Sequence, residues 1–158
     1  MAIIKEDGTG LADANVYADL ADFKVWADNR SMDYAVFSDP QIEGALVVAT
    51  EWLDAHYTFK GQALSDTQAL SLPTDTVSIN RSVVAATCHV AHYHLSGLLT
   101  PSATTVGIKS VRKKLDTLET ETVYQDGVTQ KQSYALVDSL LKKYTVIGGG
   151  VGVVFNGV

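Results

Sequence analysis

The feature that most constrains the fold is the run QIEGALVVATEWLDAHY, which follows Asp39 and Pro40. Its apolar residues recur at spacings of three and four, the period of one face of an α-helix. Pro40 suits the first helical turn, and Asp39 can cap it. We therefore expect a central helix over about 40–57. Its expected inward residues are Ile42, Ala45, Leu46, Ala49, Trp52, Leu53 and His56.

Three other segments carry helical signals. We expect helices over about 19–30, capped by Asp19, over about 81–98, opened by Asn80, and over about 133–145, capped by Ser133. The expected inward residues are Leu20, Phe23 and Ala27 in the first, Val84, Cys88, Ala91, Leu95 and Leu98 in the second, and Leu136, Leu140, Leu141 and Tyr144 in the third. We also expect a short helix that begins at Ser65 or Asp66 and ends at Leu70 or Leu72, before Pro73.

The period changes to two over residues 104–126, where β-branched residues are dense. This alternation predicts a long β-hairpin, in which the basic stretch Lys109–Lys114 could face the acidic stretch Asp116–Glu121. Its basic residues, Lys109, Arg112, Lys113 and Lys114, form either a solvated strand face or a phosphate-contacting one.

The segment 146–158 is a glycine-rich, apolar tail after a domain over 1–145 that includes the hairpin. Left uncovered, Val151, Val153, Val154 and Phe155 would form an exposed apolar strand, so they add either to this chain's sheet or to a partner's. Of these two interpretations we favour binding to a partner. The predicted fold class is thus mainly α: a bundle of about four helices with a long hairpin and an extended C-terminal strand or tail.

Composition narrows the classes of protein. A chain of 158 residues favours one domain, and a single cysteine, Cys88, permits no internal disulfide. No apolar run is long enough to span a membrane, and no signal peptide is evident, so synthesis in the cytoplasm is expected. Residues 1–66 hold twelve acids and four bases, whereas residues 67–158 hold six acids and eight bases. The acidic half argues against a large nucleic-acid footprint.

No motif carries catalytic chemistry. The loop EDGTGLADANVY at 6–17 lacks the ligand spacing of an EF-hand and the Lys–Ser/Thr pair of a phosphate loop, so a structural turn is expected. His89 and His92 could share a metal on one helix face, but histidines without that role are the favoured interpretation. Cys88 has apolar neighbours typical of an inert thiol. We therefore expect that the protein is not an enzyme and that it binds no cofactor or metal.

The order of these parts resembles the small adaptor, or head–tail connector, proteins of tailed bacteriophages, and most closely the branch labelled "DnaT-like single-stranded DNA-binding protein". The matching segments are EDGTGLADANVY at 6–17, ATEWLDAHYTFKG at 49–61, QALSLP at 68–73 and YALVDSLL at 134–141. The family usually has Trp-Pro where this chain has Leu72-Pro73.

The resemblance implies a structural protein that forms a ring, usually twelve-fold, beneath the portal of the virion. Its partners would be copies of itself, the portal protein, a downstream tail or stopper protein and passing double-stranded DNA. The expected location is the head–tail junction, with the host cytoplasm during assembly. The alternative function is a single-stranded DNA-binding replication accessory protein, and a third possibility is a small metal enzyme at His89 and His92.

Overall fold

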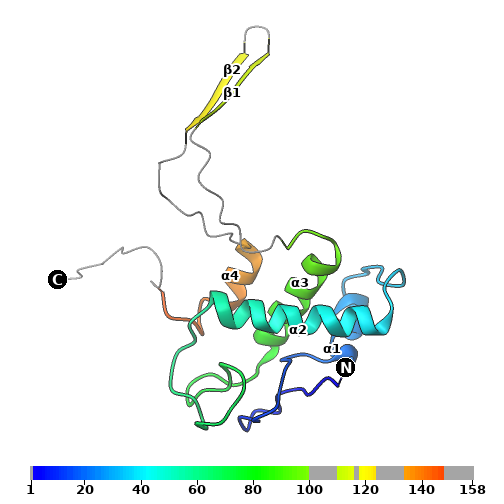
Figure 1. Cartoon of the computed structure of the whole chain (residues 1–158), viewed down its shortest axis with the longest axis vertical. Helices are drawn as coiled ribbons and strands as arrows, with labels where there is room; N and C mark the ends of the chain where they lie inside the picture. The colour runs from blue at the N-terminus through cyan, green and yellow to red at the C-terminus, as the bar shows by residue number, and fades with distance from the viewer. Residues whose placement is uncertain (1, 100–109, 116–117, 124–133, 148–158) are drawn as a thin grey trace, which may run out of the picture. The chain divides into compact units, whose positions relative to one another are not determined.

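A computed structural model describes residues 2–99, 110–115, 118–123 and 134–147 (Figure 1). Its elements, in chain order, are the helices α1 (Leu20–Asp28), α2 (Asp39–His56) and α3 (Arg81–Leu95), the strands β1 (Ser110–Leu115) and β2 (Leu118–Val123), and the helix α4 (Ala135–Leu141). The chain divides into two compact units. A helical unit comprises Met1–Leu99 and Ala135–Val158, and a second unit comprises Thr100–Tyr134.

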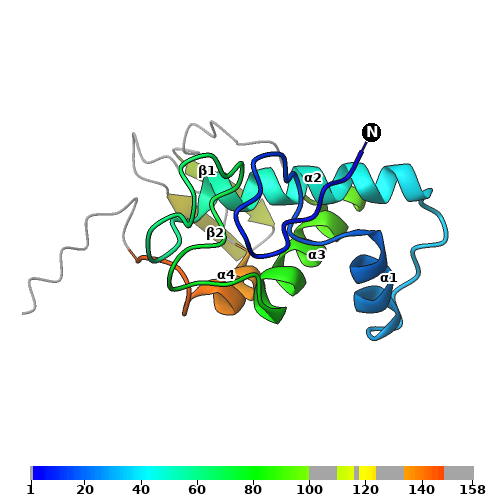
Figure 2. The same ribbon diagram turned by 90° about the horizontal axis from the view of Figure 1, so that it is seen from below.

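In the helical unit α3 packs against each of the other three helices. α1 and α4 lie toward opposite ends of α2, with α1 near its N-terminal end (Figures 1 and 2). The inward residues of α2 are Ile42, Ala45, Leu46, Ala49, Thr50 and Leu53, and those of α3 are Val83, Ala86, Thr87, Cys88, Val90 and Ala91. The core of the unit therefore lies chiefly between α2 and α3.

Local side-chain hydrogen bonds explain where the helices begin. The Asp19 side chain accepts a hydrogen bond from the Asp22 backbone N–H, and the Asp22 side chain accepts one from the Asp19 N–H, which is a capping box. The Asn80 side chain caps α3 through the backbone N–H groups of Ser82 and Val83. These two caps confirm the predicted roles of Asp19 and Asn80.

Several predicted inward residues lie elsewhere. Trp52 and His56 are only half-buried, and Leu98 and Leu136 are exposed. In α3, Cys88 and Ala91 are fully buried as predicted, whereas Val84 is half-buried and the neighbouring Val83 is fully buried. A helix covered by three neighbours buries a wide arc of its surface, and the 3.6-residue period alone does not fix which arc.

The short helix predicted from Ser65 or Asp66 is absent from the described segment 57–79, which consists of turns. Neighbouring segments fix this loop instead. The Ala69 N–H donates to the Leu11 carbonyl, and the Gln68 side-chain amide donates to the carbonyls of Leu70 and Pro73. The loop therefore satisfies its polar groups without a helical turn.

The predicted fold class is wrong as stated. The predicted β-hairpin over 104–126 is not part of the bundle, because β1 and β2 belong to the second unit and pair over only six residues each, from Ser110 opposite Val123 to Leu115 opposite Leu118. The described residues of the helical unit contain only isolated bridges and no strand. The rest of the predicted hairpin, residues 104–109, 116–117 and 124–126, lies outside the described part of the chain.

The predicted strand or tail over 146–158 is not supported either. Val146 and Ile147 follow α4 without strand structure, and residues 148–158 lie outside the described part of the chain. Within the described part, none of the helices is both long and apolar enough to cross a membrane.

Candidate nucleic-acid interface

The opening loop closes around one of its own carboxylates. Glu6 is 1% exposed, and its Oε1 accepts hydrogen bonds from the backbone N–H groups of Gly8, at 3.0 Å, and Gly10, at 2.9 Å. The Leu11 N–H donates to Oε2 at 2.9 Å. Gly8 and Gly10 have φ values of 96° and 82°, which turn these N–H groups inward. The loop is thus a structural turn whose anion site is filled by Glu6.

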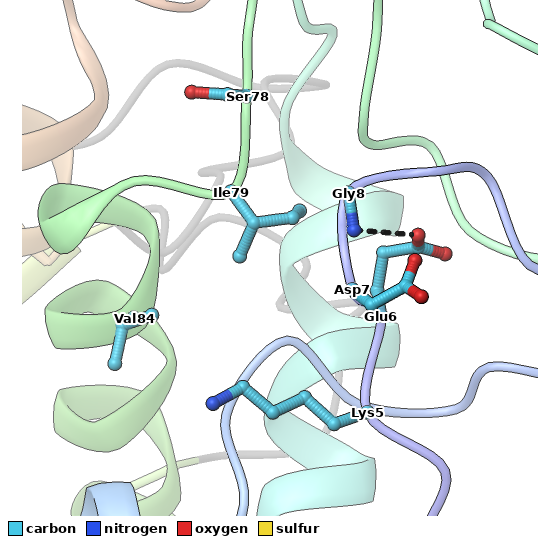
Figure 3. A pocket seen from close by; sticks show the side chains of 7 residues that line it. All are labelled: Lys5, Glu6, Asp7, Gly8, Ser78, Ile79 and Val84. Atoms are coloured by element: carbon cyan, nitrogen blue, oxygen red, sulfur yellow. Dashed lines mark hydrogen bonds between the residues drawn. The ribbon is translucent and has the colours of Figure 1, made fainter.

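A pocket of about 550 Å³ lies beside this loop, and Ile79 and Val84 form its apolar side (Figure 3). Its polar groups are engaged within the chain. The Lys5 ammonium lies 2.5 Å from Asp22 Oδ2 and 3.6 Å from Asp19 Oδ2, and Glu6 binds the loop backbone. Burial lowers the pKa of Lys5, but the hydrogen bond and charge of Asp22 outweigh it and raise the pKa. The pocket offers no unengaged cation for a phosphate.

His89 and His92, the predicted alternative metal pair, pack on an indole. Their ring centroids lie 4.7 Å and 6.1 Å from that of Trp26. Burial, with smaller contributions from Arg30 and His92, lowers the pKa of His89 to about 4, and burial also lowers that of His92. Among the described residues no group of three or more His, Cys, Asp or Glu side chains could hold a metal ion.

Cys88 lies in the core between the helices and is fully buried. Burial raises the pKa of its thiol to about 12, so the reactive thiolate is disfavoured at neutral pH. This arrangement fits an inert packing thiol.

The helical unit is strongly acidic. Across residues 2–99 and 134–147 it carries 14 acidic and 7 basic residues, a net charge of −7. Lys5 and Lys24 lie within ion-pair distance of acids, and the Arg30 guanidinium lies 4.9 Å from the centre of the Trp26 ring. Most of this unit would repel a phosphate backbone.

Three exposed lysines, Lys60, Lys142 and Lys143, form a lysine cluster in this acidic unit. The chain after α2 pairs with the chain after α4 through a bridge between Phe59 and Thr145. The Lys60 backbone N–H donates to the Tyr144 carbonyl at 2.9 Å, and the Lys60 ammonium donates to the Lys143 carbonyl at 2.9 Å. Spacing along the chain does not predict this cluster, because Lys60 and Lys143 are 83 residues apart.

The predicted site residues fall in three places. Arg112, Lys113 and Lys114 are consecutive in β1, where the register sets Arg112 opposite Glu121 and Lys114 opposite Glu119. Lys109 lies outside the described residues, as do the four tail residues Val151, Val153, Val154 and Phe155. β1 thus supplies a second run of basic residues, separate from the lysine cluster.

Comparison with known proteins gives one family. A family model described as "Putative DnaT-like ssDNA binding protein" matches residues 1–156. No curated protein and no solved structure matches the chain.

This match contradicts the connector interpretation. Nothing in the comparisons points to a phage head–tail connector, so the predicted ring, the portal and tail partners and the passing double-stranded DNA are corrected to a family named for binding single-stranded DNA. The family name supports the alternative function instead. The expected virion location is not tested and stays a prediction.

Proposed function

Because the chain belongs to the family of DnaT-like ssDNA binding proteins, we propose that it binds single-stranded DNA. The observation that carries this proposal is the extent of the family match, which covers residues 1–156 and so includes both compact units. No catalytic step is part of the proposal.

The distribution of charge supports contacts at particular places rather than over the whole surface. β1 holds three consecutive basic residues, and the lysine cluster gathers three more on the helical unit. Cations contribute to DNA binding by neutralising phosphates and releasing counterions. The remaining acidic surface of the helical unit would then disfavour the phosphate backbone away from the lysine cluster.

A salt titration with a fluorescently labelled oligothymidine tests the function. We expect the dissociation constant to rise steeply with salt, and we expect Lys113→Ser with Lys114→Ser to reduce the slope of log K against log salt by about 1.4, or about 0.7 for each lost phosphate contact. A control with the same loss of charge is Lys24→Ser with Arg81→Ser, which removes cations outside both basic places.

The outcomes separate the function from its location on the chain. If the parent protein does not bind oligothymidine even at low salt, the proposed function is wrong. If the parent binds and the β1 variant changes the slope no more than the control, then β1 does not contact phosphate.

A further inference from the structure

Three aromatic rings gather at the C-terminal end of α2. The Trp52 and His56 rings are stacked, with centroids 4.0 Å apart and planes 17° apart. The centroids of the Tyr57 and Trp52 rings lie 5.9 Å apart, and the ring planes are inclined by 66°. Trp52, His56 and Tyr57 are each half-buried. We refer to them as the aromatic step.

Trp52 and His56 are not part of the buried face of α2. The His56 Nδ1 lies 2.8 Å from the Trp52 carbonyl oxygen, a contact that holds the imidazole in place over the indole. The two rings are therefore arranged as a stack before any ligand is present.

Hydrogen bonds connect the aromatic step to the lysine cluster. The Tyr57 hydroxyl donates to Asp138 Oδ1 on α4, and the backbone N–H of Lys142 donates to the carbonyl of that same aspartate at 2.9 Å. Lys60 follows Tyr57 by three residues and binds the Lys143 carbonyl. Aromatic rings and exposed ammonium groups thus share one end of the helical unit.

We propose that the stacked Trp52 and His56 rings receive the bases of single-stranded DNA, while the lysine cluster holds the phosphates of the same strand. The proposal rests on the proposed function and adds its site on the helical unit. Proteins that bind single strands without sequence preference combine aromatic stacking with a basic path for the backbone. A single strand exposes the faces of its bases, whereas a duplex covers them.

The distribution of charge favours a polyanion at the lysine cluster. The helical unit has a net charge of −7 over its described residues, so a polyanion is favoured where lysines gather and disfavoured elsewhere. Acids near the rings include Glu51, which precedes Trp52 and is exposed, Asp54 between Trp52 and His56 in the sequence, and Asp138, which accepts the Tyr57 hydroxyl bond. The phosphates of the strand should therefore lie at the lysine cluster rather than along the rest of the unit.

The test compares two replacements of Trp52 in the full-length chain, with a labelled oligothymidine of about 20 nucleotides as the probe. Trp52→Leu keeps apolar bulk but removes the ring, and we expect binding to weaken about tenfold or more. Trp52→Phe keeps a ring and should bind within about threefold of the parent. Tyr93→Leu on α3 is the matched control, because it removes another half-buried aromatic ring far along the chain from the lysines.

Tryptophan fluorescence gives a second readout. The chain has two tryptophans, and Trp26 is buried. Stacked bases should quench the parent's emission, and Trp52→Phe should abolish the quench while binding persists. Lys142→Ser with Lys143→Ser should lower the salt slope by about 1.4, and Lys24→Ser with Arg81→Ser should not.

If the parent binds and Trp52→Leu binds equally well, the aromatic step is not the stacking site and the proposed function still stands. Equal affinity of the parent for the matching duplex also overturns stacking. If the parent does not bind oligothymidine at all, the proposed function fails and this site fails with it.

Discussion

At the scale of single residues, Glu6 occupies the place that a bound anion takes in a phosphate-binding loop. Three backbone N–H groups converge on its carboxylate, from Gly8, Gly10 and Leu11. Backbone nests of this kind bind anions because their N–H dipoles point to one spot. Here the anion is covalently part of the chain, so the loop is held closed without a ligand.

Replacing Glu6 should therefore cost stability. We expect Glu6→Ala to lower the free energy of unfolding by about 3 kcal/mol, because three N–H groups lose a charged acceptor in a partly buried loop. Urea denaturation followed by circular dichroism measures this loss. Asp7→Ala is the control, since Asp7 is exposed and accepts hydrogen bonds only from Thr9 in this loop, with an expected loss of about 0.5 kcal/mol. Equal losses would contradict the closing role of Glu6.

His89 should make stability depend on pH between about 4 and 6.5. Burial against Trp26 lowers the pKa of His89 in the folded protein to about 4, from an ordinary value of 6.5. Between pH 6.5 and pH 4 the unfolded chain therefore binds a proton at His89 that the folded chain does not bind. Stability therefore falls as the pH drops through this window and levels off below pH 4. Because the side chain is half-exposed, we expect a loss of roughly 1–2 kcal/mol.

Thermal melting at several pH values checks this prediction. His89→Gln should remove much of the loss between pH 6.5 and pH 4, and the residual slope should come from His92, whose pKa is also lowered by burial. His94→Gln, at an exposed position on the same helix, should leave the slope unchanged. A slope that persists in His89→Gln at the parent's value would show that other groups cause it.

At the scale of elements, helix caps fix where the helices begin. The Asn80 side chain accepts hydrogen bonds from the N–H groups of Ser82 and Val83, and α3 packs against every other helix of the unit. We expect Asn80→Ala to lower the free energy of unfolding by about 1 kcal/mol, the usual cost of an N-cap. Chemical denaturation checks this value, with Asn29→Ala as the control at an exposed position that ends α1 through its backbone. A loss no greater than in that control would exclude a capping role.

The sequence predicted the elements better than it predicted their faces. Asp19, Pro40 and Asn80 carry local signals, and local signals decide where a helix begins. Burial depends on what packs against each helix, so Trp52 was predicted in the core and is only half-buried. The pairing of Phe59 with Thr145 links distant segments, and no spacing rule predicts such a contact.

The candidate site was harder still to predict. Averaging charge over residues 1–66 argued against DNA binding, but it hid Lys60, the one basic residue of that half that joins the lysine cluster. The basic residues of β1 were identified, because they are consecutive. The lysine cluster could not be identified from the sequence, because the fold brings its residues together from distant segments.

At the scale of the whole molecule, the division into two units has a direct experimental consequence. Both tryptophans, Trp26 and Trp52, belong to the helical unit, so tryptophan emission reports the melting of that unit. β1 and β2 belong to the other unit. Tryptophan emission can therefore follow the helical unit while the ladder of the other unit is changed by substitution.

Breaking the ladder should leave the helical unit folded. We expect Val111→Pro to disrupt β1, since proline cannot donate a backbone hydrogen bond in a ladder, with no more than about 1 °C change in the tryptophan-detected melting temperature. Leu46→Ala, a fully buried position in α2, should lower the stability of the helical unit by about 2–5 kcal/mol. A large shift with Val111→Pro would show that the units depend on each other for stability.

The order of the segments also determines when the lysine cluster can form during synthesis. α4 and the residues after it return to the helical unit only after Thr100–Tyr134 has been made. Lys60 is synthesised well before Lys142 and Lys143. The contact between Lys60 and Lys143 therefore joins residues that are 83 positions apart in the sequence and forms late in synthesis. A nascent chain therefore lacks the complete lysine cluster until the polypeptide is nearly finished.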